Sequence, residues 1–343
     1  MSQMKSVTLA LQGGGSHGAF TWGVLDRLLE DKNLDIEAIS GASAGAVNAV
    51  VLAHGYMLDG RDGARKALSD FWERVSLKAP FNFPSDDTNA ALDLSSGAEA
   101  PMALKMFLSL TRIFSPYQLN PFDINPLRDI LAEQIDFERL QAVGKIKLFV
   151  AATQVSTGML KVFRNKQLTL DALLASACLP AIHRAVEIDG EAYWDGGFTA
   201  NPPIFPLLHQ CGARDIMVVL LHRNPHTAVP TSAEEICSRL TDIGFSAALF
   251  TELQGIALAK REAQRTWFAF GRLERRLRKL NVHQIDSREF MSRLSGLSKL
   301  NTQAPFIQAL HNEGRAQADK WLQKNFRHLG VRSSFSLASY LRR

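Results

Sequence analysis

LALQGGGSHGAF, residues Leu9–Phe20, joins a strand pattern to a helix pattern through three consecutive glycines. The preceding run SVTLALQ is short, apolar and rich in β-branched residues, which is typical of a buried strand. Beyond the glycines, apolar residues recur at helical spacing from Phe20 to Leu29. A strand, a tight loop and a helix in this order predict the first unit of an α/β protein.

The spacing of Gly13, Gly15 and Gly18 matches the G-x-G-x-x-G pattern of a dinucleotide site. Such a site also needs an acidic residue at the end of the second strand, where it binds the ribose. In this chain that place holds Ser40-Gly41, and Asp35 lies at the other end of the strand. The glycines therefore favour a different anion, with a nicotinamide nucleotide site kept as an alternative.

Ser43 lies in Gly41-Ala-Ser-Ala-Gly45, a G-x-S-x-G pattern placed between a buried strand and an apolar helix. In that context the pattern is typical of a strained turn that exposes a nucleophilic serine, although a tight turn that only packs remains the alternative. Parallel strands carry their sites at the carboxyl ends, so the glycine loop and Ser43 are expected at the same sheet edge. Amides of Gly13, Gly14 and Gly15 would then stabilise an oxyanion.

A serine nucleophile needs a base, and Asp195 in Tyr-Trp-Asp-Gly-Gly-Phe is the outstanding candidate. It follows the hairpin pattern at residues 186–194 and precedes two glycines that permit close approach. An Asp-Gly turn that only ends the hairpin is the alternative interpretation. His283 offers a rival Ser-Asp-His triad, although a serine at position 43 comes early for that arrangement.

The rest of the chain predicts a three-layer α/β/α sandwich with a mainly parallel central sheet and a helical carboxy-terminal cap, forming one domain over residues 1–343. We expect a lid or insert at 79–125 and a mostly helical part at 232–343 packed on the core. The predicted elements are strands at 145–153, 215–222 and 282–285, a hairpin turning at Asp189-Gly190, and helices at 168–177 and 304–325.

With these motifs in order, the chain resembles the patatin-like phospholipase family, acyl hydrolases with a Ser-Asp dyad on an α/β/α sandwich. The resemblance runs from about Val7 to His222 and includes residues 175–203. It implies Ser43 as nucleophile, Asp195 as its base, residues 13–15 as the oxyanion hole, and no metal or cofactor. The family usually has Arg or Lys where this chain has His17. A structural role is favoured for this histidine, and a weaker, pH-dependent version of the usual cation is the alternative.

Composition supports a globular protein, with 46% hydrophobic and 21% charged residues in a chain of 343. Neither a membrane span nor a signal peptide is recognisable, so a cytoplasmic location is expected. The three cysteines Cys178, Cys211 and Cys237 predict buried, reduced thiols rather than disulfides or metal ligands.

The formal net charge of +5 is concentrated between Lys260 and Arg288, where nine Lys or Arg face three acidic residues. A solvated helical face is the plain interpretation. Contact with an anionic membrane surface is the alternative, with Trp267, Phe268 and Phe270 as anchors, and it would also suit a catalytically weak membrane-surface adaptor. No motif indicates nucleic-acid binding. The predicted function is a serine hydrolase of lipid esters of the phospholipase or lysophospholipase type; neutral glycerides and hydroxyacyl ester oligomers are alternative substrates.

Overall fold

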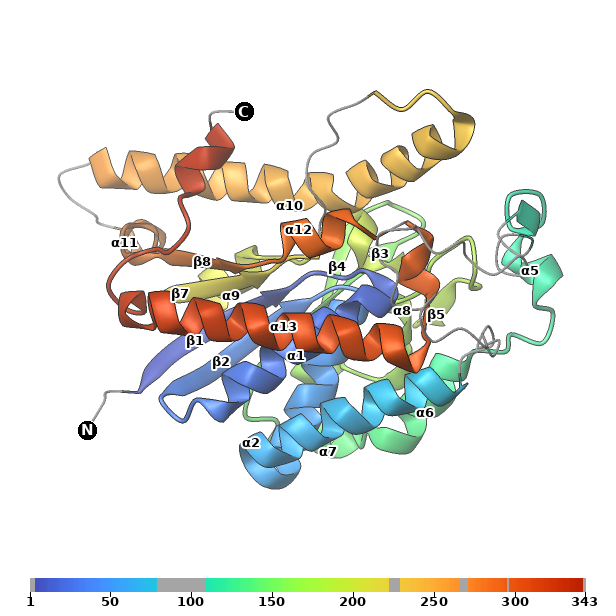
Figure 1. Ribbon diagram of the computed structural model, residues 1–343, viewed down its shortest axis with the longest axis horizontal. Helices are drawn as coiled ribbons and strands as arrows, with labels where there is room; N and C mark the ends of the chain where they lie inside the picture. Colours follow the sequence, from blue (N-terminus) through green and yellow to red (C-terminus); the bar gives the residue numbers. More distant parts are fainter. Residues whose placement is uncertain are drawn as a thin grey trace.

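A computed structural model of the chain describes residues 4–78, 106, 109–221, 229–265, 271–294 and 296–341 (Figure 1). Within these ranges one eight-stranded sheet has the order β5-β6-β3-β2-β1-β7-β8, with β4 paired to β3. The pairs among β3, β2, β1, β7 and β8 are parallel, and those involving β4, β5 and β6 are antiparallel. The strands are β1 (Lys5–Leu11), β2 (Leu34–Gly41), β3 (Lys147–Gln154), β4 (Leu160–Arg164), β5 (Val186–Ile188), β6 (Glu191–Asp195), β7 (Asp215–Val219) and β8 (Asn281–Ile285).

Helices cover both faces of this sheet, which confirms the predicted three-layer α/β/α class (Figure 1). One core cluster joins the sheet to α1 (Gly18–Glu30), α2 (Ala44–Lys78), α6 (Pro126–Gln134), α7 (Phe137–Val143), α8 (Leu170–Ser176) and α13 (Ala304–Asn325). The opposite cluster joins it to α9 (Phe205–Gln210), α10 (Ala233–Arg265) and α11 (Arg272–Lys279). The short helices α5 (Pro116–Leu119) and α12 (Arg288–Ser292) lie in connections.

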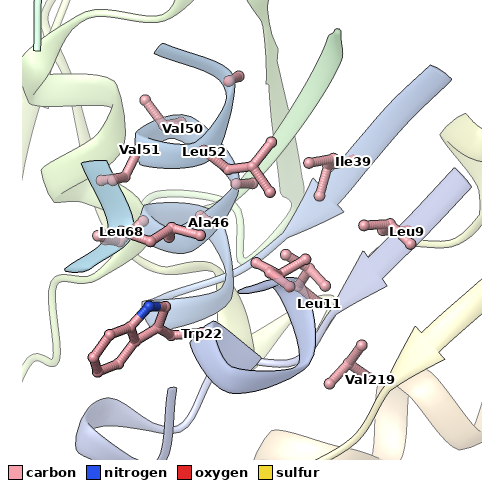
Figure 2. Packing of buried hydrophobic residues seen from close by; sticks show 14 of the residues in the cluster. Leu9, Leu11, Trp22, Ile39, Ala46, Val50, Val51, Leu52, Leu68 and Val219 are labelled. Carbon is pink, nitrogen blue, oxygen red and sulfur yellow. The ribbon is translucent and has the colours of Figure 1, made fainter. Parts of the chain in front are cut away.

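Alternation along the central strands divides the core into these two clusters. Leu9 and Leu11 of β1 face the α1 and α2 side, and Ala10 between them faces the α10 side. Figure 2 shows Leu9 and Leu11 on the side of the sheet occupied by Val50 of α2. Burial of a leucine side chain contributes about 1.5–3 kcal/mol relative to exposure, so Leu9 and Leu11 favour the central place of β1 in the sheet.

Most of the elements expected from the pattern are present. The hairpin turns at Asp189 (φ 52°) and Gly190 (φ 80°), the positive angles that an Asp-Gly turn supplies. The strand expected at 282–285 is β8, and the helix expected at 304–325 is α13. The strand β4 was not predicted; its five residues LKVFR are half-buried and lack a long apolar run. Residues 233–341 thus supply both helices and an edge strand.

Two sequence expectations need correction or fall outside the description. Cys178 and Cys211 are buried, free thiols as expected, but Cys237 is exposed on α10 and the prediction of burial is wrong for it. The first turns of α10 are largely exposed where they are described, so Cys237 stays exposed although apolar residues lie near it in the sequence. Of the predicted lid at 79–125, residues 79–105, 107 and 108 lie outside the described residues, as do Trp267, Phe268 and Phe270.

The strand β3 aligns the ends of two other strands. β4 pairs with β3 over a stretch that overlaps the pairing of both β2 and β6, so β4 occupies one edge of β3. Both β2 and β6 therefore pair along the other edge. Gly41, the last residue of β2, is opposite Val150, and Asp195, the last residue of β6, is opposite Ala152. The two strands run in opposite directions, so their carboxyl ends meet two residues apart along β3.

No helix in the described ranges is both long enough and apolar enough to cross a membrane.

Candidate active site

The backbone turn at Ser43 is strained, as the sequence pattern predicts. Its φ is 53°, in the left-handed region that non-glycine residues avoid at a cost of about 1–3 kcal/mol. The Ser43 N–H donates to both the carbonyl oxygen and Oγ of Ser176, at 3.0 and 3.1 Å. The turn leads directly into α2, whose first N–H groups point towards it.

The two flanking glycines are required by close packing. A Cβ on Gly41 would lie 2.6 Å from the backbone nitrogen of Ala46, and a Cβ on Gly45 would collide with the carbonyl oxygen of Leu11. Any side chain at either position would therefore push apart the strand, the turn and the helix. The G-x-S-x-G pattern here is a packing requirement of the turn.

The glycine loop lies against this turn, as expected for neighbouring parallel strands. A Cβ on Gly13 would lie 2.5 Å from the carbonyl oxygen of Ala42 and 2.6 Å from Cβ of Ser43. Gly15 has φ 58° and begins the short 3-10 helix η1 (Gly15–His17). The structure thus brings the loop within contact distance of the serine.

The three predicted oxyanion donors differ in availability. The Gly13 N–H already donates to Oδ1 of Asn201 at 2.6 Å, so it is not free in this conformation. The Gly14 and Gly15 N–H groups have no acceptor in the part of the chain that the structure describes. The N–H groups of Gly14 and Gly15 are therefore open donors, whereas the N–H of Gly13 anchors the loop to Asn201.

Asp195 is held by its backbone and by one carboxylate oxygen. Its N–H donates to the carbonyl oxygen of Cys178 at 2.8 Å, and its Oδ1 accepts from the Gly197 N–H at 2.7 Å. The residue is fully buried. The other oxygen, Oδ2, is buried and has no partner at hydrogen-bond geometry among the described residues. That oxygen is available to a reacting group.

The electrostatics of Asp195 suit a base. Burial raises the pKa of its carboxyl from 3.8 to about 7, against the opposing effects of the Gly197 N–H and the Ser43 hydroxyl. Because the Ser43 hydroxyl contributes to this pKa, it lies near the carboxylate, although no hydrogen bond joins the two in this conformation. Ser43 and Asp195 are thus brought together although 152 positions separate them in the sequence.

Two polar residues of the site were not singled out from sequence. Asn201 is 1% exposed and bridges the loop to α10, because its Nδ2 donates to the carbonyl oxygen of Phe245 at 3.1 Å while its Oδ1 accepts from Gly13. Ser176, at the end of α8, is fully buried and accepts the Ser43 N–H. An Asn-Pro just after Asp-Gly-Gly was the available signal for Asn201; nothing local marks Ser176.

The two histidines considered from sequence have other partners. His17 is 1% exposed and its Nε2 lies 2.7 Å from Oγ of Ser298, so it ties η1 to the 3-10 helix η4 (Leu297–Leu300). His283 is fully buried on β8, with Nε2 2.9 Å from Oδ1 of Asp215 and Nδ1 2.9 Å from Oγ of Ser334. Asp215 begins β7, at the opposite end of the sheet from Ser43. The alternative triad with His283 is therefore wrong.

Over the described residues, no group of three or more His, Cys, Asp or Glu side chains is arranged to hold a metal ion.

Comparison with known proteins agrees with this geometry. The family model described as patatin-like phospholipase matches residues 9–208, which is more than half of the chain and includes Ser43 and Asp195. A curated protein of Escherichia coli (strain K12), uncharacterized protein YjjU, is 25% identical over 215 residues, covering 62% of this chain and 51% of that protein. The chain thus spans about half the length of this relative.

Two solved structures are similar at low identity. VipD from Legionella pneumophila has a TM-score of 0.40 at 15% identity, covering 94% of this chain and 67% of that chain. ExoU from Pseudomonas aeruginosa, solved in complex with SpcU, has a TM-score of 0.31 at 17% identity, covering 72% and 51%. Taken with the match over residues 9–208, the ordered glycine loop, serine turn and buried aspartate place this chain in the patatin-like phospholipase family.

Proposed function

We propose that this chain is a serine hydrolase that cleaves carboxylic ester bonds of lipids, of the phospholipase or lysophospholipase type. Family membership supports a lipid acyl hydrolase. One observation carries the finer assignment: the strained Ser43 turn faces a fully buried carboxyl whose pKa is raised to about 7. A hydroxyl beside such a base, with open amides nearby, is the arrangement that acyl transfer needs.

In the proposed acylation step, Oγ of Ser43 attacks the ester carbonyl carbon while Oδ2 of Asp195 takes the hydroxyl proton. The carbonyl oxygen becomes an oxyanion, which the N–H groups of Gly14 and Gly15 stabilise. Collapse of this intermediate breaks the bond to the alcohol oxygen, and Asp195 gives its proton to that leaving group. Water then attacks the acyl-serine with Asp195 again as base, releasing the fatty acid and restoring the serine.

A carboxylate can serve as the sole base here because of its surroundings. In water an aspartate of pKa near 4 takes up a serine proton poorly. Burial brings the pKa of Asp195 to about 7, close to the range in which proton acceptance and proton donation are both feasible. The same group can therefore act as base in one half of the cycle and as acid in the other.

The test is fatty acid release from a phospholipid and from a p-nitrophenyl acyl ester. Ser43→Ala and Asp195→Asn should each abolish turnover, and Asp189→Asn is the matched control because it makes the same chemical change at the exposed tip of the same hairpin. Circular dichroism establishes that each variant is folded. Full turnover by either folded active-site variant would disprove the dyad.

The same experiment addresses the ester class. Phospholipids, lysophospholipids, neutral glycerides and hydroxyacyl ester oligomers present the same reacting carbonyl, so the dyad alone does not choose among them. Product profiles of the wild type against Ser43→Ala identify the preferred ester. A profile without any phospholipid or lysophospholipid product would reject the phospholipase assignment while leaving the esterase chemistry in place.

A further inference from the structure

A small cavity far from Ser43 is surrounded by positive charge. It has a volume of about 250 Å³ and lies beside α11, where β7 and β8 begin. We name it the basic cavity. Its lining contains five cationic side chains and no carboxylate: Leu208, Gly212, Ala213, Arg214, Arg272, Arg275, Arg276, Lys279 and Leu280.

The cations of the basic cavity come together by helical spacing. Arg272, Arg275 and Lys279 stand at positions i, i+3 and i+7 of α11, which places them on one side of the helix. Arg214, on the turn before β7, adds a fourth charge from another element. All four are exposed, and within the described ranges none of them has a carboxylate partner.

Other cations of the segment from Lys260 to Arg288 are already occupied. Arg265 lies 3.2 Å from Glu262, and Arg288 lies 2.9 Å from Asp286. Lys260 donates to the carbonyl oxygen of Leu280. Part of the excess positive charge of this segment therefore lies in ordinary surface ion pairs and in a contact with the backbone. These cations are distinct from the ones that line the basic cavity.

Arg276, which also lines the basic cavity, is held by the backbone and leaves one donor unused. Its guanidinium donates to the carbonyl oxygens of Cys211 and Ala213, while its Nε is buried with no partner among the described residues. Burial lowers the pKa of Arg276, and the neighbouring positive charge of Arg272 adds to that effect. The nearby Glu37 opposes it, but Glu37 already accepts from Gly212, Ala213 and Lys147.

Uncompensated positive charge of this kind is stabilised by a bound anion. One guanidinium group can donate two parallel hydrogen bonds to the oxygens of a phosphate, and four arginines line this cavity. The volume is below the range of roughly 300–1,000 Å³ typical of pockets that enclose drug-sized ligands. The space suits a phosphate or diphosphate group better than a whole lipid.

The position of the basic cavity decides between a lipid and a soluble ligand. It lies at the amino ends of β7 and β8, whereas Ser43 follows the carboxyl end of β2. Figure 1 shows α11 at one end of the sheet and α8, whose Ser176 holds the Ser43 turn, towards the other. A five-residue strand such as β7 separates the two ends by about 16 Å. A membrane bound at the cavity would hold the serine on the far side.

We propose that the basic cavity binds the phosphate groups of a soluble, multiply charged small molecule, at a site separate from the ester site. The inference stands apart from the proposed hydrolase activity, because none of the lining residues belongs to the dyad or the glycine loop. On this proposal the unpaired cations of α11 bind a phosphorylated ligand and not an anionic membrane.

Isothermal titration calorimetry with pyrophosphate at low ionic strength tests this proposal. The double variant Arg272→Gln/Arg275→Gln should weaken pyrophosphate binding roughly tenfold or more. Arg261→Gln/Arg265→Gln is the matched control: it removes the same charge from the same basic segment, at residues outside the cavity that contact Glu262. The control should bind as the wild type does. Ser43→Ala should also bind normally, whatever its effect on hydrolysis.

A second arm uses phosphatidylglycerol–phosphatidylcholine vesicles in a sedimentation assay. We expect the cavity variant and the control to associate with vesicles to the same extent. The proposal fails if the wild type does not bind pyrophosphate, or if both double variants lose binding equally, because bulk charge then explains it. It also fails if vesicle association drops in the cavity variant alone, since that result assigns the cavity to a lipid headgroup.

Discussion

Ser43 and Asp195 are each held in a state that an isolated residue would avoid. The backbone of Ser43 is left-handed, and the carboxyl of Asp195 is withdrawn from water. Hydrogen bonds from and to neighbouring residues maintain both: Ser176 accepts the Ser43 N–H, and Gly197 donates to Asp195. The strain and the burial are costs to stability that the proposed chemistry uses.

The pKa of Asp195 sets an expected pH dependence of catalysis. Only the deprotonated carboxylate can accept the Ser43 proton, so kcat/KM should rise with pH and level off above an apparent pKa of about 7. The measurement is the pH profile for a p-nitrophenyl acyl ester, corrected for spontaneous hydrolysis. A profile already level from pH 5 upward would show that Asp195 is not a base of raised pKa.

The same group predicts a gain of stability when its charge is removed. The native carboxyl keeps its proton up to about pH 7, whereas the unfolded one loses it near 3.8, so the free energy of unfolding falls as pH rises between these values. Asp195→Asn should therefore be more stable than the wild type at pH 8, by on the order of 2–4 kcal/mol. Urea unfolding at pH 8 and pH 4 measures the difference, which should nearly vanish at pH 4.

At the scale of single residues, the sequence singles out candidates that are flanked by glycines. Ser43 and Asp195 were predicted because small neighbours reveal a tight turn and a close approach. Asn201 was not, because its role depends on contacts with residues far away in the sequence: Gly13, 188 positions away, and Phe245. The occupied Gly13 N–H was likewise beyond prediction, since a backbone donor gives no sign in sequence of which acceptor it meets.

Among the elements, α1 and α13 cross unusually closely. A Cβ on Gly23 of α1 would collide with the carbonyl oxygen of His311, and one on Gly314 of α13 would collide with that of Phe20. Each helix thus presents a glycine to the backbone of the other. The glycines cost some helix propensity, and the contact between the helices offsets it.

Gly314→Ala should destabilise the protein through this crossing. The added methyl group has no space, so we expect a loss of about 1–3 kcal/mol in the free energy of unfolding. Gly255→Ala is the control, because a Cβ there, on the exposed side of α10, meets nothing within 4 Å and should stabilise by up to about 1 kcal/mol. Equal effects of the two substitutions in urea unfolding would contradict the proposed close contact.

The sequence predicts those helices and strands whose own residues carry a clear turn or periodicity signal. The hairpin at 186–194 and the helix α13 have complete local signals, in an Asp-Gly turn and a regular apolar stripe. The strand β4 has neither, and its place depends on pairing with β3. Elements formed mainly by pairing are those that a single sequence conceals.

At the scale of the whole molecule, Asp26 and Asp195 change the free energy of unfolding in opposite directions as pH rises. Burial would raise the pKa of Asp26, but His311, Arg65 and Arg315 outweigh that effect and hold the pKa well below its usual range. These partners come from α2 and α13, so one carboxylate on α1 joins three helices over one face of the sheet. Its contribution is present above the unfolded pKa near 3.8 and is lost as pH falls below it.

Asp26→Asn should therefore destabilise the protein at neutral pH, by on the order of 2–3 kcal/mol. The expected loss is modest because both arginines are partly exposed to solvent, which screens their attraction to the carboxylate. Thermal unfolding at pH 7 and pH 3 measures the effect, and the difference from the wild type should shrink at the lower pH. A penalty that stays constant from pH 7 to pH 3 would show that packing, and not the ionised carboxylate, makes the contribution.

The strand β3 contributes no side chain to the proposed chemistry, yet it sets the spacing between the proposed nucleophile and the proposed base. Val150 and Ala152 each hold the end of one incoming strand, with only Ala151 between them. One residue inserted there would lengthen this spacer by about 3.3 Å, which exceeds the tolerance of a proton transfer between two oxygens. The number of residues between Val150 and Ala152 is thus fixed by the distance that the proposed proton transfer requires.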